Sequence, residues 1–283
     1  MRKTFGSILI VFIILLTITI PATAITGGQE DENRHPYGAL LLVPGFGFCS
    51  GTLIDEDLVL TAGHCIRSLK TNEIQELWVT FDPYAAVDPA TWEITDGTWY
   101  TASSWKEHPG YTASDLPFIF DYDYGLVFLD KPVVDIAPAA LPEKWIVDGL
   151  VGTTGQTNLL FNDVGYGQSG VSFEQKPYVG NFDFIRKFSI QRYNPSNGSF
   201  VGTRDPRLLI LQNNPSENHG GACNGDSGSG IFLDSGQSAD TILAVHTGGY
   251  PIGYLGMNCG MMTSFNLRVD LPEVLDWITI YIN

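Results

Sequence analysis

Short apolar or alternating runs dominate the hydrophobic pattern of this chain. Runs of a few residues, separated by glycine and proline, are typical of strands joined by tight turns. The 283 residues include 31 glycines and 16 prolines, which supply residues for those turns. The pattern therefore predicts an all-β fold with many turns. The clearest predicted strands cover residues 38–43, 77–81, 124–129, 207–211 and 241–246.

The first 24 residues follow a different pattern, which we interpret as a signal peptide. Arg2 and Lys3 form a positive head, residues 8–20 form an apolar stretch, and Ala22-Thr23-Ala24 supplies small residues for cleavage. A stretch of 13 residues is shorter than the roughly 20 needed to span a bilayer. We therefore expect a secreted protein, with no membrane association after cleavage; an uncleaved anchor is the alternative.

The composition is that of a well-filled and strongly acidic globular protein. Hydrophobic residues make up 44% of the chain, and the formal net charge is −16. Cleavage after residue 24 would leave 13 basic against 31 acidic residues, a charge of −18. Such a surface repels nucleic acid and anionic membranes, so we expect neither as a partner. Surface acidity usually serves solubility, and we assign it no catalytic role.

Candidate chemistry begins in residues 224–230, Asn-Gly-Asp-Ser-Gly-Ser-Gly, where Ser227 stands between glycines. A serine hydroxyl becomes a useful nucleophile when a base takes its proton and donors stabilise the resulting oxyanion. Flanking glycines allow the tight turn that aims backbone N–H groups at that oxyanion. Gly, Asp and Ser also occur together in loops simply because they favour turns, so a catalytic role for Ser227 needs support from elsewhere in the chain.

Two other segments supply that support. His64 follows the apolar run 58–60 and precedes Cys65. A metal site at His64 and Cys65 is disfavoured. The nearest other histidine or cysteine in the sequence is Cys49, and it is too far away for a zinc knuckle. Asp123 stands at the mouth of an apolar strand, where an acid is costly to bury unless it is paired. Holding an imidazole N–H is a pairing that suits it.

These three segments resemble the trypsin/chymotrypsin family of serine proteases. The family's nucleophile motif matches the serine segment, its Thr-Ala-x-His-Cys motif matches residues 61–65, and its Asp-x-x-Leu motif begins at Asp123. The order His, Asp, Ser also agrees. Further matches are Ile-Thr-Gly-Gly at 25–28 with the mature amino terminus, Val-Gly-Tyr-Gly at 164–167, and 269–278 with the closing helix.

The resemblance implies the fold and the domain organisation. It implies two packed antiparallel six-stranded β-barrels, chymotrypsin-like, with a C-terminal helix and a catalytic cleft between the barrels. We expect a signal peptide over 1–24 and a peptidase domain over 25–283. The first barrel would cover about 25–140 and the second about 143–283. We expect a monomer that acts on protein or peptide substrates and uses no cofactor or metal.

The resemblance also implies the role of each site residue. Ser227 would be the nucleophile, His64 the general base and then acid, and Asp123 the residue that orients His64, with Asp121 as the nearest alternative acid. The backbone N–H groups of Gly225 and Ser227 would form the oxyanion hole. Four cysteines in an oxidising compartment favour two disulfides. The pairs that the resemblance selects are Cys49–Cys65 and Cys223–Cys259.

Substrate preference is less sharply indicated. Gly221 stands where trypsin-like members carry an aspartate and Ala222 follows, which predicts an uncharged pocket floor and a preference for an uncharged residue. His246 raises glutamate as the alternative, because glutamate-specific relatives carry a histidine in a Val/Ile-His-x-Gly-Gly string. The favoured interpretation of His246 is a half-buried histidine bonded to backbone. Thr247 could offer its hydroxyl to Asp123. The remaining expected pocket residues are Asn224, Gly248 and Gly249.

Activation is predicted to follow directly from export. In this family a freed amino terminus inserts and pairs with the aspartate before the nucleophile, here Asp226. The signal cleavage site abuts Ile25 directly, so signal peptidase itself would generate the activating terminus.

Two further expectations concern the surface: an extra loop over 84–101, and exposed positions for His35, His108 and His219. The competing class of function is a non-catalytic binding protein with a protease fold.

Overall fold

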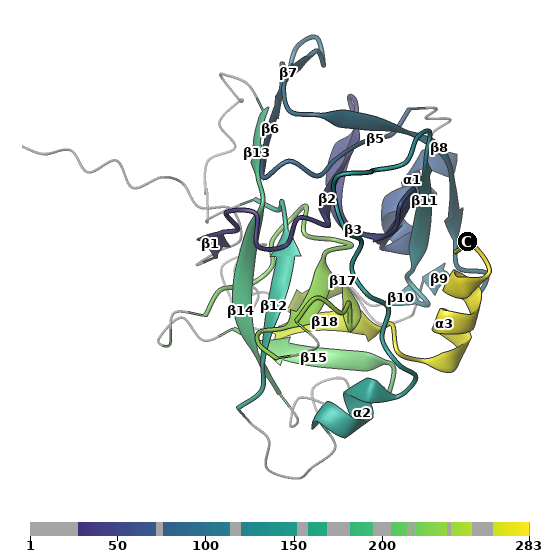
Figure 1. Cartoon of the computed structure of the whole chain (residues 1–283), viewed down its shortest axis with the longest axis vertical. Helices are drawn as coiled ribbons and strands as arrows, with labels where there is room; N and C mark the ends of the chain where they lie inside the picture. The colour runs from purple at the N-terminus through teal and green to yellow at the C-terminus, as the bar shows by residue number, and fades with distance from the viewer. Residues whose placement is uncertain are drawn as a thin grey trace, which may run out of the picture.

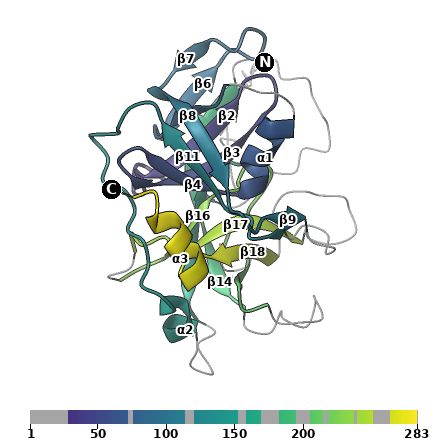
Figure 2. The same ribbon diagram turned by 90° about the vertical axis from the view of Figure 1, so that its right-hand side faces the viewer.

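Two rings of antiparallel strands dominate the computed structural model, one above the other in Figure 1. The structure describes residues 28–71, 76–113, 120–151, 158–168, 182–194, 205–213, 217, 219–236, 239–250 and 263–282. Figure 2 shows the same two groups of strands after a quarter turn, with α3 alongside both.

The first barrel comes from the amino-terminal half and is closed in the order β11-β4-β3-β2-β5-β8. β2 and β4 are buried along their whole length, as expected for apolar runs at the centre of a barrel. The predicted strand 38–43 is confirmed residue for residue. The six strands are β2 (Gly38–Val43), β3 (Gly47–Asp55), β4 (Leu58–Thr61), β5 (Trp78–Thr80), β8 (Trp99–Glu107) and β11 (Gly125–Leu129).

The second barrel has the order β14-β12-β16-β17-β18-β15, and it closes because β14 also pairs with β15. The short strand β1 (Gln29–Glu30) lies along the free edge of β14, so residues close to the predicted mature terminus join the second barrel. The six strands are β12 (Leu160–Gly165), β14 (Lys187–Tyr193), β15 (Leu208–Gln212), β16 (Gly230–Leu233), β17 (Ala244–Tyr250) and β18 (Thr263–Arg268).

One hydrophobic cluster connects both barrels with the C-terminal helix. It contains first-barrel residues such as Val59, second-barrel residues such as Val164 and Phe188, and the apolar face of α3 (Pro272–Thr279). Proline suits the start of α3, because backbone N–H groups in the first turn of a helix have no acceptor within the helix, and proline lacks this N–H. The helix therefore packs across the junction between the barrels. The predicted fold, two six-stranded barrels with a C-terminal helix, is confirmed.

The expected surface loop over 84–101 is instead ordered structure, and that expectation was wrong. β6 (Tyr84–Val87) pairs with β7 (Ile94–Asp96) and with β13 (Phe182–Ile185), a strand from much later in the chain. Val87 and Phe184 are buried there in a small cluster with Tyr166.

The remaining elements are α1 (Gly63–Thr71), α2 (Ile146–Val151), β9 (Thr112–Ala113) and β10 (Phe120–Asp121).

Two further observations bear on the predicted organisation. The boundary predicted between the two barrels, after residue 140 and before residue 143, falls between β11 and α2, and Ala140 forms an isolated bridge with Thr241; the boundary itself stays a prediction. The predicted signal peptide and Ile25 lie outside the described residues. Within the described part of the chain, every helix is too short or too polar to cross a bilayer.

Candidate active site

His64 stands in the first turn of α1, directly after β4 of the first barrel. Gly63 makes this turn possible, because a Cβ there would lie 2.9 Å from the Tyr111 ring and 3.0 Å from the Tyr124 carbonyl oxygen. Glycine thus lets the start of the helix approach the segment that carries Asp123. The buried strand fixes the backbone, and the close approach fixes the direction of the histidine side chain.

Asp123 holds His64 by two hydrogen bonds. Its Oδ1 accepts the His64 backbone N–H at 2.7 Å, and its Oδ2 lies 2.7 Å from His64 Nδ1. The Asp123 side chain is fully buried, whereas the His64 side chain keeps 24% of its surface exposed. A carboxylate can only accept, so Nδ1 carries the proton and Nε2 is the acceptor nitrogen of the ring. This is the tautomer that a general base needs.

The hydroxyl of Thr247 donates a hydrogen bond to the same Asp123 oxygen, which confirms the expected Thr247 contact. Asp121, the alternative acid, lies elsewhere: its carboxylate pairs with the Arg207 guanidinium at 2.8 Å, and 39% of its side chain is exposed. Of the two candidate acids, the structure therefore brings only Asp123 to His64.

Ser227 lies in a turn that packs against the His64 segment. Its carbonyl oxygen accepts the Ser50 backbone N–H at 2.8 Å and lies 3.6 Å from Cys65 Sγ. Gly228 has a φ of 85° and fits against Thr61, where any larger residue would collide. Ser227 and His64 are far apart in the sequence, and they come close together where the two barrels meet. A hydrogen bond from Ser227 Oγ to the imidazole remains a prediction.

Gly225 also adopts a backbone conformation that requires glycine. Its φ is 97°, and the Phe48 ring occupies the space where a Cβ would project. The Gly225 carbonyl oxygen accepts a hydrogen bond from the Ser50 hydroxyl at 2.9 Å, which anchors the turn from the β3 side. The role of Gly225 and Ser227 as oxyanion donors stays a prediction.

Asp226 is fully buried, and its carboxylate is held by backbone N–H groups. Gly167 N–H donates to Oδ1 at 2.7 Å and Cys223 N–H to Oδ2 at 2.8 Å. Burial, and then the charge of Asp163, raise the pKa of Asp226 well above its usual range, against the lowering effect of these two bonds. Ile25, the other member of the predicted activation pair, lies outside the described residues, so the pair stays a prediction.

The predicted pocket residues are mostly buried beside this turn. Gly221, Ala222 and Thr247 are buried, whereas Asn224 is exposed. Gly248 and Gly249 continue β17 after Thr247. A register irregularity in the pairing of β17 with β18 falls between His246 and Gly248, at the pocket wall.

His246 is only 2% exposed and is bonded to a side chain, not to backbone. Asn266 donates its amide N–H groups to the Leu209 carbonyl oxygen and to Ser264, so its Oδ1 accepts from His246 Nδ1 at 3.0 Å. The neutral ring therefore has an acceptor at Nε2. Receiving a substrate carboxylate there would require a protonated imidazole.

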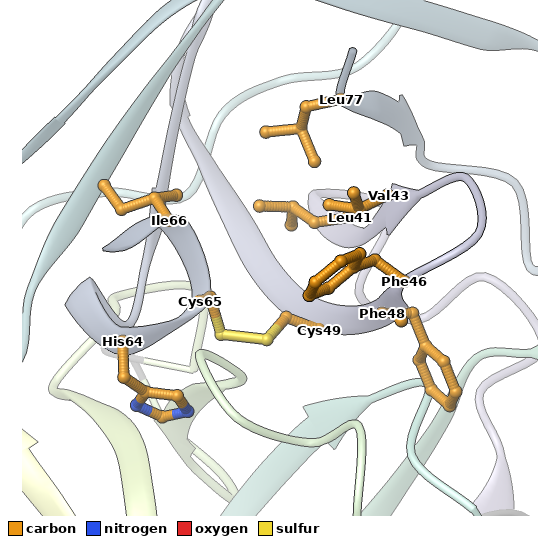
Figure 3. A pocket seen from close by; sticks show the side chains of 10 residues that line it. Leu41, Val43, Phe46, Phe48, Cys49, His64, Cys65, Ile66 and Leu77 are labelled. Atoms are coloured by element: carbon orange, nitrogen blue, oxygen red, sulfur yellow. A yellow bond between two sulfur atoms is a disulfide. The ribbon is translucent and has the colours of Figure 1, made fainter. Parts of the chain in front are cut away.

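An apolar hollow of about 180 Å³ adjoins His64 on the side of the first barrel (Figure 3). The Cys49–Cys65 disulfide, predicted from the sequence and confirmed here, forms part of its wall. Cys49, His64 and Cys65 have the spacing of a metal site, but sulfurs joined in a disulfide offer no thiolate ligand. The other lining residues are Leu41, Val43, Phe46, Gly47, Phe48, Ile66 and Leu77.

Other sequence expectations have mixed outcomes. Cys223 is disulfide-bonded, but its predicted partner Cys259 lies outside the described residues, so that pairing stays a prediction. The expectation that His35 and His219 are surface residues was wrong, since both are buried. His35 is buried because Asp31 binds both its ring and its backbone N–H.

Several buried polar residues near the site were missed from the sequence. Ser50 links the nucleophile turn to β3 and donates to Gly225. Asp163 accepts hydrogen bonds from Ser229 and Gln191 inside the second barrel. Lys187 is buried on the neighbouring strand. For Asp163, the apolar residues on either side of Asn162-Asp163 are the signal that could have identified it. Lys187 follows Arg186 in the sequence and gives no such signal.

Comparisons with known proteins agree with this geometry. A family model described as Trypsin matches residues 25–278. The thrombin-like enzyme BjussuSP-1 of Bothrops jararacussu is 26% identical over 261 residues, which cover 90% of this chain and 94% of that protein. The snake venom serine protease catroxase-1 of Crotalus atrox is 28% identical over 265 residues, covering 90% and 84% of the two chains.

Among solved structures, a mutant of human heparin binding protein (CAP37) superimposes with a TM-score of 0.60. It covers 90% of this chain and 95% of its own at 19% identity, a likeness that concerns the fold alone. The family model, in contrast, matches most of the sequence, including all three segments of the candidate site. This chain therefore belongs to the trypsin family of serine proteases.

Proposed function

We propose that this protein is a secreted serine endopeptidase that cleaves proteins or peptides through an acyl-enzyme. The observation that carries the proposal is the pairing of Asp123 with His64, whose ring and backbone N–H both bind one buried carboxylate. That arrangement fixes the tautomer in which Nε2 can accept the proton of a nearby serine. The turn of Ser227 packs against the same segment.

In the proposed reaction, Ser227 Oγ attacks the substrate carbonyl carbon while His64 Nε2 takes the hydroxyl proton. The N–H groups of Gly225 and Ser227 stabilise the oxyanion, which develops only as the reaction proceeds. His64 then gives its proton to the leaving amine, and the peptide bond breaks. Water repeats the sequence on the acyl ester and releases Ser227. The apolar hollow beside His64 offers a surface for the leaving-group side of the substrate.

We propose a preference for an uncharged residue before the scissile bond, because Gly221 and Ala222 place no anion at the pocket floor. The bond from His246 to Asn266 supports this preference, since it leaves an acceptor on the neutral ring. Glutamate preference through protonated His246 is the second candidate. Cleavage after glutamate that weakens as pH rises and is lost in His246→Ala would favour it. Efficient cleavage after Arg or Lys would contradict both.

We further propose that signal peptidase activates the enzyme by freeing Ile25, whose ammonium group would pair with Asp226. The burial of Asp226 supports this proposal, because a buried carboxylate needs a partner to be ionised. Removing one partner of a buried pair costs about 3–5 kcal/mol, enough to depopulate the active state. Amino-terminal sequencing of the secreted protein tests it. A terminus elsewhere, or full activity after adding one residue before Ile25, would contradict it.

A serine-directed phosphonylating probe tests the main proposal. We expect one covalent addition, seen as an intact-mass shift, in the wild type and in Ser103→Ala, a control at an exposed serine. We expect no addition in Ser227→Ala. Failure of the folded wild type to react would instead favour a non-catalytic member of the family that binds partners.

A further inference from the structure

Asp123 stands in a backbone turn that only firm contacts can hold. Tyr122, directly before it, has a φ of 49°, in the left-handed region that large residues rarely adopt. The Tyr124 backbone N–H donates to the Tyr122 carbonyl oxygen at 2.7 Å, which closes a three-residue turn with Asp123 at its centre. Such a conformation costs free energy and persists only where the surroundings hold it. The contacts that hold Tyr122 therefore also decide where the Asp123 carboxylate points.

Two groups contact the ring of Tyr122, and we call the three residues the Tyr122 clamp. The His108 ring is stacked on it, with 4.8 Å between the ring centroids and 10° between the planes. The central carbon of the Arg207 guanidinium lies 5.5 Å from the centroid of the Tyr122 ring, a cation–π contact. His108 directly follows β8 of the first barrel, and Arg207 directly precedes β15 of the second. Tyr122 is thus contacted from both barrels.

His108 is itself fixed by its neighbours. Its ring meets the Trp277 ring of α3 edge-on, with 4.8 Å between the centroids, and its Nδ1 accepts the Gly110 backbone N–H at 3.1 Å. Burial lowers the pKa of His108, which keeps the stacked ring neutral at neutral pH. A Cβ on Gly110 would lie 2.9 Å from the Tyr122 ring, so glycine lets this segment approach the ring closely.

Arg207 is held from the side of the second barrel. Its Nε and one terminal nitrogen donate to the two oxygens of Asp205, at 3.0 and 2.7 Å, a bidentate arrangement that fixes the plane of the guanidinium. The same terminal nitrogen donates to Asp121 at 2.8 Å. Because Asp205 binds Arg207 through both oxygens, the guanidinium keeps its place over Tyr122 without Asp121.

We propose that Tyr122 is a positioning residue for Asp123, whose carboxylate stays aimed at His64 because the Tyr122 clamp holds the turn. This rests on the proposed function and adds to it a contribution from both barrels. The two Asp123 oxygens bind the backbone N–H and Nδ1 of His64 at the same time, so a small rotation of the turn lengthens at least one of these bonds. Without the clamp, the carboxylate would hold the imidazole less of the time.

The first test is independent of catalysis. In a Ser227→Ala chain, proton NMR follows the downfield signal of the His64 Nδ1 proton and its exchange with water. We expect Tyr122→Leu to speed this exchange at least about tenfold, because the bond to Asp123 opens more often, and Tyr122→Phe to leave it unchanged, because the ring remains. An unchanged rate in a folded Tyr122→Leu chain overturns the proposal.

Arg207→Met tests the clamp from outside the turn, and it decides if Tyr122→Leu does not fold. Its matched control is Lys131→Met, which removes an ammonium 5.0 Å from the centroid of the Tyr100 ring. We expect Arg207→Met to speed the exchange about twofold to fivefold, the value of an exposed cation–π contact, and Lys131→Met to leave it unchanged. Equal effects of the two variants overturn the proposal.

The second test measures kcat and KM of the mature enzyme on a peptide that the wild type cleaves. We expect Tyr122→Leu to lower kcat at least about tenfold and to change KM less than about twofold, because a misplacement of about 1 Å near the reacting groups can cost about 10²-fold. Tyr122→Phe should restore kcat. A loss confined to KM or to the free energy of unfolding would mean a residue that only packs, and overturns the proposal. If the wild type itself is inert, the proposed function fails and the NMR test alone decides on Tyr122.

Discussion

Replacement of Arg186 by methionine should destabilise the protein strongly, because this side chain holds the amino-terminal segment onto the second barrel. Arg186 is fully buried, and its Nε donates to Asp31 Oδ2 at 2.9 Å. The same guanidinium donates to the carbonyl oxygen of Phe81 at 2.6 Å and to Asn33 Oδ1 at 2.8 Å. Methionine would fill much of the volume but leave the buried Asp31 carboxylate without its cation and the Phe81 carbonyl oxygen without this donor.

Removing one partner of a buried ion pair costs about 3–5 kcal/mol. Small proteins are stable by only about 5–15 kcal/mol, so Arg186→Met should remove a large part of the free energy of unfolding. Urea unfolding of the mature chain, followed by tryptophan fluorescence in a Ser227→Ala background, measures this quantity. The matched control is Arg192→Met in β14, the strand that follows Arg186, whose half-exposed pair with Glu217 should contribute about 0–1 kcal/mol. Similar losses in the two variants would refute the reasoning.

Asp31, the acidic partner of Arg186, makes the free energy of unfolding depend on pH. Burial alone would raise the pKa of Asp31, but hydrogen bonds from His35 and the charge of Arg186 outweigh burial and lower it. A lowered pKa in the folded state gives stability that is present above the unfolded value of about 3.9 and lost as pH falls through the folded value. The destabilisation caused by Asp31→Asn should therefore be full near neutral pH and shrink below about pH 4.

Three further predictions concern the site. Asp123→Asn should lower kcat by about 10⁴, because it inverts the hydrogen bond that sets the histidine tautomer, whereas Asp121→Asn should keep near-normal kcat; the reverse result would mean that the acid is misassigned. Thr247→Val removes a hydrogen bond to a buried carboxylate and should cost about 1.5–3 kcal/mol in unfolding free energy; no measurable loss would contradict this. Burial and Asp163 raise the pKa of Asp226, so an inactive chain with a blocked terminus should lose stability relative to Asp226→Asn as pH rises above about 4; parallel pH profiles would argue against it.

Features that depend on short local patterns were predictable from the sequence. The apolar run that precedes His64, the acid at the start of β11 and the Cys49–Cys65 pair all lie where the motifs place them. The family resemblance likewise placed the closing helix at 269–278, close to its observed bounds of Pro272–Thr279. In each case the residues that decide the structure lie within about ten positions of each other or in a well-marked motif.

Features that depend on distant partners were not predictable. The run at 84–101 reads as a turn-rich loop, and only its pairing with β13 turns part of it into a buried sheet. His35 lies in a polar context, yet Asp31, which is itself paired with Arg186, binds its ring and its backbone N–H and compensates its burial. Lys187 would be placed on the surface by its charge alone. These residues are buried because of contacts that the local pattern does not contain.

The two halves of the candidate site differ in what holds them. His64 and Asp123 belong to the first barrel, where buried apolar residues such as Val59 and Leu126 surround them and where their hydrogen bonds are already formed. The turn of Ser227 belongs to the second barrel, whose interior carries Asp163, Asp226 and Lys187. Buried charges without partners oppose folding, so this half should be ordered fully only when a cation neutralises Asp226. Under the proposed function, the general base would thus be in place before the oxyanion donors are, and control of activity would lie with the amino terminus that is proposed to reach Asp226.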